Sequence, residues 1–315
     1  MTTTPLHPFN RRNVLAAAGA LVTAATLGGL ARAASAQTAE RSIQKGVLEV
    51  PGARLYYESL GSGSPLLLIP GGNGTAHIFG PISQILAARF TVITFDRRGF
   101  ARSGLVGAQD YGRRLQTDAD DALQLIKRVA GAPAAVFGPS SGAIVALQAM
   151  SQEPGSISKL VAYEPPVMKQ LGAEGQTILQ RFGEQYDLYK KSGPIPALEQ
   201  FNTIFPPETV EHLARMRDTS NPASRAAVEY WFEHELRQYT AADLDIDTLK
   251  TNAGRIVVAA GEGSRGYPLY PTAANLAKTI GASFVELPGA HTGYAVRSAE
   301  FGPALLNILG AGKER

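Results

Sequence analysis

The chain of 315 residues is 44% hydrophobic, enough apolar material for a large buried core in one domain with room for a sub-lobe. Its formal net charge of +3 comes from residues 1–36, which hold three arginines and no acidic residue. The remaining residues balance 27 basic against 27 acidic side chains and contain no basic run, which argues against nucleic acid or an anionic membrane as a partner. The absence of cysteine excludes disulfides and thiolate chemistry.

Residues 1–36 are predicted to be an export signal peptide. Arg11-Arg12 precedes an uncharged stretch, residues 14–31, and Ala34-Ser35-Ala36 offers small residues at the positions that a signal peptidase reads. The paired arginines and the weak hydrophobicity of the stretch resemble twin-arginine signals. We therefore predict an exported protein, periplasmic or secreted, that is cleaved before Gln37 and has no stable membrane association afterwards. An uncleaved membrane anchor is the alternative.

After residue 36 the chain alternates strand-like and helix-like segments. Two alternating segments around Pro51-Gly52 predict an opening hairpin, and the later strands are short continuous apolar runs, typical of strands buried on both faces. The predicted strands are 46–50, 54–60, 66–69, 91–95, 134–137, 160–163, 255–260 and 283–287. The predicted helices are 82–89, 110–129, 143–151, 271–280 and 299–309. This order implies parallel crossovers and a mostly parallel central sheet flanked by helices, an α/β fold.

The alternation breaks after the sixth predicted strand. Residues 166–250 contain no clear strand, and segments near 174–191, 195–204, 207–217 and 222–238 have helical spacing between Pro and Gly breaks. We interpret residues 166–250 as a helical cap over the carboxyl ends of the strands. The domain prediction is therefore a core formed by 37–165 and 251–315, with this cap inserted between its two parts.

The segment Gly138-Pro139-Ser140-Ser141-Gly142 lies between a predicted strand and a predicted helix. A Gly-x-Ser-x-Gly pattern in a strand–turn–helix context is typical of a nucleophile elbow, in which a strained turn exposes the serine oxygen at the sheet edge. The free N–H groups at the start of the following helix suit the chemistry of acyl transfer. The sequence therefore predicts Ser140 as a nucleophile.

A serine nucleophile needs a base, and residues 37–315 contain four histidines. His291 follows the last predicted strand in a Pro-Gly loop, at the same sheet edge as Ser140, so we predict it as the base. His212 and His234 fall on cap helices beside glutamates and are predicted to face solvent. His77 follows the glycine-rich loop after the third predicted strand and could line the pocket.

These residues resemble the α/β-hydrolase superfamily over nearly all of the chain after residue 36. Ser140 and His291 match the nucleophile and the base of that superfamily in its chain order. Pro70-Gly71-Gly72-Asn73-Gly74 resembles its oxyanion loop. The resemblance implies that the amides of Gly72 and Ser141 hold the oxyanion.

A second stretch, Asp96-Arg97-Arg98-Gly99-Phe100-Ala101-Arg102-Ser103, is similar to the Asp-x-Arg-Gly-x-Gly-x-Ser turn of the superfamily. We interpret it as structural, with Asp96 and the arginines holding the loop in place. No catalytic role is assigned to it.

The acid of the triad departs from the usual pattern. Most members of the superfamily carry Asp about three residues after the glycine that ends the seventh strand, and this chain has Ser264 there, in Gly261-Glu262-Gly263-Ser264. Glu164, directly after the sixth predicted strand, takes the place used by certain haloalkane dehalogenases and zearalenone lactonases. We favour Glu164, and Glu262 remains an alternative.

The sequence thus predicts an α/β-hydrolase fold and a serine hydrolase of carboxylic esters or lactones, acting on a small to mid-sized, partly apolar substrate without metal or other cofactor. Two alternatives stay open. One is hydrolysis of a carbon–carbon or amide bond by the same triad, and the other is a non-catalytic protein whose pocket only binds a ligand. The serine argues against an epoxide hydrolase or dehalogenase, whose nucleophile is Asp. The sequence indicates no oligomeric state.

Overall fold

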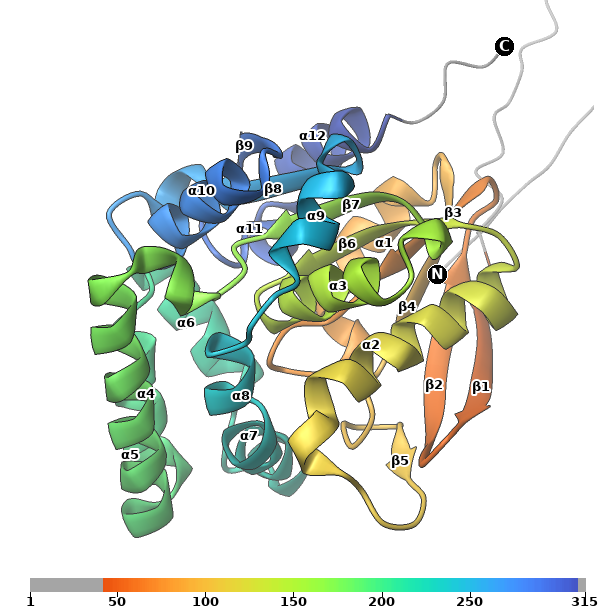
Figure 1. The fold of residues 1–315 in the computed structure, drawn as a ribbon. Helices are drawn as coiled ribbons and strands as arrows, with labels where there is room; N and C mark the ends of the chain where they lie inside the picture. The colour runs from red at the N-terminus through yellow and green to blue at the C-terminus, as the bar shows by residue number, and fades with distance from the viewer. Residues whose placement is uncertain (1–41, 311–315) are drawn as a thin grey trace, which may run out of the picture. The chain divides into compact units, whose positions relative to one another are not determined.

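A computed structural model describes residues 42–310, so the predicted signal peptide lies outside the described residues. These residues form a nine-stranded sheet in the order β1-β2-β4-β3-β6-β7-β8-β9, with β5 paired to β2 (Figure 1). The strands are β1 Gln44–Val50, β2 Ala53–Leu60, β3 Ser64–Leu68, β4 Phe90–Phe95, β5 Gly104–Leu105, β6 Ala134–Pro139, β7 Ile157–Tyr163, β8 Ile256–Gly261 and β9 Ser283–Leu287. Six neighbouring strands are parallel, so their carboxyl ends meet at one edge of the sheet: β4, β3, β6, β7, β8 and β9.

The predicted hairpin and parallel sheet are confirmed. Strands β1 and β2 pair antiparallel around the two-residue turn, where Gly52 takes a φ of +78°. The sequence prediction omitted β5, because a two-residue strand carries no periodic signal. The predicted helix 110–129 corresponds to a 3-10 turn over Tyr111–Arg113, an α-helix over Arg114–Leu125 and a π-helical segment over Ile126–Ala130, which ends at left-handed Gly131.

Helices cover both faces of the sheet because successive strand residues point to opposite sides. Leu66 and Leu68 belong to the buried cluster under α1, α11 and α12, whereas Leu67 and Ile69 belong to the cluster under α2, α3, α9 and α10. These helices are α1 Gly80–Leu86, α2 Arg114–Leu125, α3 Ser141–Gln152, α9 Ile246–Thr251, α10 Leu269–Ile280, α11 Gly293–Val296 and α12 Ser298–Leu309. No helix within residues 42–310 is long and apolar enough to cross a membrane.

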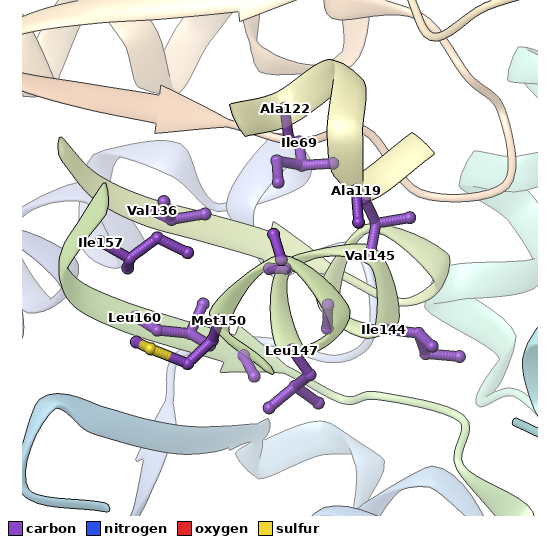
Figure 2. Close-up of a cluster of buried hydrophobic side chains, with 14 of the residues drawn as sticks. Ile69, Ala119, Ala122, Val136, Ile144, Val145, Leu147, Met150, Ile157 and Leu160 are labelled. Atoms are coloured by element: carbon purple, nitrogen blue, oxygen red, sulfur yellow. The ribbon is translucent and has the colours of Figure 1, made fainter. Parts of the chain in front are cut away.

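Helix α3 is buried on nearly all sides, which fixes the turn that precedes it. Figure 2 shows Val145 facing Ala119 of α2, while Met150 lies beside Ile157 and Leu160 of β7. A helix with few polar residues suits this position on the sheet between the neighbouring helices α2 and α9. Truncation of such a fully buried leucine or methionine costs about 2–5 kcal/mol of stability, so the core holds α3 firmly in place.

Between β7 and α9 the chain forms five α-helices, which are grouped together beside the sheet (Figure 1). They are α4 Ala173–Ser192, α5 Pro194–Asn202, α6 Pro207–Met216, α7 Pro222–His234 and α8 Leu236–Thr240. Proline occupies the first turn of α5, α6 and α7, where its fixed φ suits a helix start and its missing N–H costs no hydrogen bond. We call helices α4–α8 the cap; they bury a separate aromatic core that includes Phe182, Phe201 and Trp231.

Candidate active site

Ser140 occupies the strained turn that its motif predicts. It follows β6 and precedes α3, with φ +55° and ψ −128°, values that a non-glycine residue rarely adopts. Its N–H donates to the carbonyl oxygen of Tyr163 at 2.8 Å. A Cβ at Gly138 would collide with the carbonyl of Gly142, and a Cβ at Gly142 with the carbonyl of Ile69. The two glycines are therefore required for the turn that presents the serine.

Glu164 lies at the same edge, directly after β7, and is fully buried. Its Oε2 is 2.6 Å from Nδ1 of His291, and its Oε1 accepts a 2.7 Å hydrogen bond from the N–H of Gly261. Its own N–H donates to the carbonyl of Ala259 at 2.8 Å, and its φ is +46°. Like Ser140, Glu164 is thus held in a costly backbone conformation by its neighbours.

The imidazole of His291 is buried in the loop between β9 and α11. The hydroxyl of Tyr163 donates to the carbonyl of Ala290 at 2.7 Å, which anchors this loop to β7. The Phe205 ring of the cap lies 4.8 Å from the imidazole, centroid to centroid. Because a carboxylate only accepts, the proton of the neutral ring resides on Nδ1 and leaves Nε2 as an acceptor.

Ser140 and His291 line the same small cavity of about 30 Å³, together with Gly72 and cap residues that include Phe205 and Trp231. A second cavity of about 20 Å³ borders Ser140 on the side of Phe182 and Leu269. Each has room for only one or two water molecules. Any ester larger than that needs the aromatic cap side chains to move aside.

The loop after β3 supplies a backbone amide whose direction is fixed. The carbonyl of Gly71 accepts from Nη2 of Arg97 at 2.8 Å and from the N–H of Gly74 at 2.9 Å. In a trans peptide the N–H points opposite to the C=O, so the Gly72 N–H points away from Arg97. Ser141 begins α3, and its N–H therefore has no acceptor within the helix. Gly72 and Ser141, the two residues predicted to form the oxyanion hole, both line the cavity of Ser140.

Arg97 belongs to a buried ion-pair network that joins the core to the cap. Its guanidinium pairs with Asp118 of α2 and Glu235 at the start of α8, both at 2.7 Å. The Tyr239 hydroxyl of the cap also donates to Asp118 at 2.7 Å. Burial raises the pKa of Glu235, and the facing arginines oppose that shift. The prediction that this turn is structural is supported, and the network reaches the oxyanion loop as well.

The other sequence candidates lie elsewhere. Glu262 is exposed, whereas Ser264 is buried and its Oγ has no hydrogen-bond partner within residues 42–310. His77 lines a separate cavity of about 330 Å³ beside β2 and β4, away from Ser140. The prediction that His212 and His234 face solvent is wrong: His234 is half-buried against the Tyr111 ring, and Nε2 of His212 is buried.

Sequence reasoning missed three polar side chains of the cavity. Nδ2 of Asn73, Nη1 of Arg217 and Oγ1 of Thr292 are buried and have no hydrogen-bond partner among the described residues. Asn73 lies inside the oxyanion-loop motif, but Arg217 carries no local signal at all. The part of the chain from 42 to 310 contains no group of three or more His, Cys, Asp or Glu side chains placed to hold a metal.

Comparison with known proteins gives consistent matches. Residues 66–301 match the profile of the alpha/beta hydrolase family. The uncharacterized hydrolase YraK of Bacillus subtilis (strain 168) is 33% identical over 272 residues, which cover 85% of this chain and 97% of YraK. The zearalenone hydrolase of Cladophialophora bantiana is 32% identical over 133 residues, 41% of this chain and 49% of that protein. The crystal structure of an alpha/beta hydrolase from Sphaerobacter thermophilus superimposes with a TM-score of 0.62 at 26% identity, covering 84% of this chain and 99% of that one.

Proposed function

We propose that this chain, which belongs to the alpha/beta hydrolase family, is a serine hydrolase that cleaves carboxylic esters or lactones through an acyl-enzyme. The observation that carries the proposal is the 2.6 Å contact between His291 Nδ1 and Glu164 Oε2. It lies at the sheet edge that bears the strained Ser140 turn, and Ser140 and His291 line one cavity. Acyl transfer by a serine requires a nucleophile, a base that takes its proton and a carboxylate that holds the base.

In the proposed reaction the Oγ of Ser140 attacks the carbonyl carbon while Nε2 of His291 takes the hydroxyl proton. The amides of Gly72 and Ser141 donate to the oxyanion that forms. The intermediate collapses, the C–O bond to the leaving alcohol breaks, and His291 returns the proton to that oxygen. Water then attacks the acyl-enzyme by the same steps and releases the acid. In a lactone the leaving alcohol stays attached to the product.

Glu164 is the proposed acid of the triad. Its carboxylate holds the imidazole through Nδ1 and stabilises the imidazolium that forms when Nε2 takes the proton. The Gly261 N–H donates a hydrogen bond to the other carboxylate oxygen, Oε1, and so fixes the orientation of the carboxylate. Glu262 is exposed and Ser264 has no carboxylate, which leaves the Glu164 position as the one that suits this role.

The proposed substrate is small to mid-sized and partly apolar. The cap contributes Phe201, Phe205 and Trp231 to the cavity walls, and aromatic walls bind apolar groups. Because the cavities beside Ser140 hold only about 20 and 30 Å³, we propose that the cap opens to admit the substrate and closes over the acyl-enzyme.

A stopped-flow reaction with p-nitrophenyl acetate tests the proposal. We expect a burst of about one equivalent of p-nitrophenolate, followed by slower turnover, because acylation by this activated ester outruns deacylation. Ser140→Ala should abolish both phases. Ser151→Ala, at the far end of the same helix, is the matched control and should behave as the parent. A folded parent protein without burst or turnover would favour the non-catalytic alternative.

We also propose export through residues 1–36 on the twin-arginine pathway. Sequence alone supports this, since Arg11-Arg12 and Ala34-Ser35-Ala36 lie outside the described residues. The full chain expressed in a bacterial host should yield a periplasmic or secreted product whose first residue is Gln37. Replacement of both paired arginines by lysine should leave the uncleaved precursor in the cytoplasm, and normal export of that variant would refute the route.

A further inference from the structure

Arg217 brings a cation to the cavity of the proposed nucleophile. It follows the last residue of α6, and its guanidinium carbon lies 5.4 Å from the centre of the Trp231 ring and 5.7 Å from that of Phe201. The side chain borders the roughly 30 Å³ cavity that Ser140 and His291 line. Part of the side chain reaches solvent, but Nη1 is buried.

The electrostatic setting of Arg217 differs from that of the other buried arginines. Within residues 42–310, Arg97 pairs with Asp118 and Glu235, and Arg98 pairs with Asp121 through two short hydrogen bonds. Arg217 has no carboxylate within ion-pairing distance in that part of the chain, and burial lowers its pKa to about 10. Removing a cation from water is costly, and proteins rarely tolerate it without a compensating partner. Aromatic faces offset only part of that cost.

Two further residues that line the same cavity carry a buried polar atom without a partner among residues 42–310. Nδ2 of Asn73 comes from the oxyanion loop, and Oγ1 of Thr292 comes from the residue after the proposed base. Together with Nη1 of Arg217 they give three buried groups that can donate hydrogen bonds and have no protein acceptor within residues 42–310. A donor-rich, positively charged wall of this kind is complementary to an oxyanion.

We propose that the substrate of this hydrolase carries a carboxylate that Arg217 binds, with Asn73 and Thr292 as further donors. The proposal rests on the proposed function, because it names a substrate class for the same site. The guanidinium fork matches the planar geometry of a carboxylate, and the single positive charge matches its single negative charge. The substrate class is therefore an ester or lactone that bears a free acid, with the ester carbonyl at Ser140 and the acid at the Arg217 wall.

Matched ester pairs test this inference. Monomethyl and dimethyl adipate differ in a charge on the acyl side, and 4-acetoxybenzoate and its methyl ester differ in a charge on the alcohol side. The parent enzyme should prefer the charged member of at least one pair by roughly tenfold or more in kcat/KM, since a charge-assisted hydrogen bond contributes about 1.5–3 kcal/mol, a factor of roughly 10–150. Arg217→Met should remove most of that preference, a loss of roughly tenfold or more, mainly through KM.

The matched control is Arg215→Met near the end of α6, because Arg215 is exposed and its one ion pair within residues 42–310 is with the exposed Glu211. It should retain the parent preference. A phosphonate analogue, 4-acetoxyphenylphosphonate, separates the two oxyanion types: the carboxylate proposal expects it to be a poorer substrate than 4-acetoxybenzoate, and a better one would overturn the assignment to carboxylate.

Failure of this inference is distinct from failure of the proposed function. If the p-nitrophenyl acetate burst depends on Ser140 but neither ester pair shows a charge preference, Arg217 does not bind substrate charge and the inference is wrong. Equal losses on charged and neutral esters in Arg217→Met, with a lower melting temperature, would give Arg217 a structural role and overturn the inference too. If the folded parent protein shows neither burst nor turnover, the proposed function fails first.

Discussion

Replacement of Glu164 by glutamine removes one charge from the site at almost constant shape. The carboxylate of Glu164 accepts two hydrogen bonds, at 2.6 Å from His291 Nδ1 and at 2.7 Å from the Gly261 N–H. A glutamine amide has one oxygen, so its NH₂ group must face one of these two donors. In one orientation the imidazole is forced into the wrong tautomer, and in the other the Gly261 N–H is left buried without an acceptor.

The magnitude follows from these two effects. Loss of the carboxylate that orients a catalytic histidine lowers kcat by about 10⁴, equivalent to roughly 5 kcal/mol of activation free energy. The orientation that keeps the correct tautomer costs about 1–3 kcal/mol for the unsatisfied amide and still loses the charge that stabilises the imidazolium. We therefore expect Glu164→Gln to lower kcat by 10³–10⁴ on p-nitrophenyl acetate.

Steady-state kinetics of Glu164→Gln and Glu262→Gln, with melting temperatures to confirm folding, test this expectation. Glu262 is exposed, so its variant should stay within about twofold of the parent. A folded Glu164→Gln enzyme with near-parent kcat, or a collapse of activity in Glu262→Gln instead, would refute the assignment of the acid.

Three further predictions concern the oxyanion loop, the ion-pair network and the cap. A Cβ at Gly72 would lie 2.7 Å from the Trp231 indole nitrogen, so Gly72→Ala should lower kcat about 100-fold. Trp231→Leu should restore part of that activity. Gly80→Ala, where the added Cβ meets open space, should have little effect. Arg97→Lys replaces the buried guanidinium that pairs with both Asp118 and Glu235, at a cost of about 3–5 kcal/mol of stability. Calorimetry should therefore show a melting temperature roughly 10 °C lower, and an unchanged melting temperature would contradict a stabilising role of the network. Burial lowers the pKa of His234, so the folded state resists protonation of this side chain, and stability should fall as the pH drops below about 6.5. His234→Phe should therefore lose less melting temperature than the parent between pH 7.5 and 5.5. An equal loss in both proteins would show that His234 is not the cause of the pH dependence.

The sequence was sufficient for eight of the nine strands of the sheet and for the residues that follow its parallel strands, because those signals are local. Short apolar runs predict buried strands, and parallel strands end at one edge, so a residue directly after a strand is placed without further information. Ser140 and Glu164 each directly follow a strand in this way, and His291 lies in the short loop that follows β9. The cap helices were predicted within a few residues, since proline marks the start of three of them.

The rest depended on contacts between segments far apart in the chain. Nothing near Arg217 in the sequence says that its guanidinium lies on two aromatic rings without a carboxylate, because its neighbours come from other helices and from the core. Glu235 has the sequence context of a solvated helix face, and only the packing of α8 onto Arg97 buries it. The size of the cavity likewise follows from how Phe205 and Trp231 pack.

Covalent labelling of the folded protein with a fluorophosphonate, followed by intact-mass and peptide-mass measurement, tests directly whether Ser140 is the nucleophile. We expect one adduct, on the peptide that contains Ser140, and its loss in Ser140→Ala. Label on another residue, or an unlabelled parent protein with a native melting curve, would contradict the claim that Ser140 is an activated nucleophile.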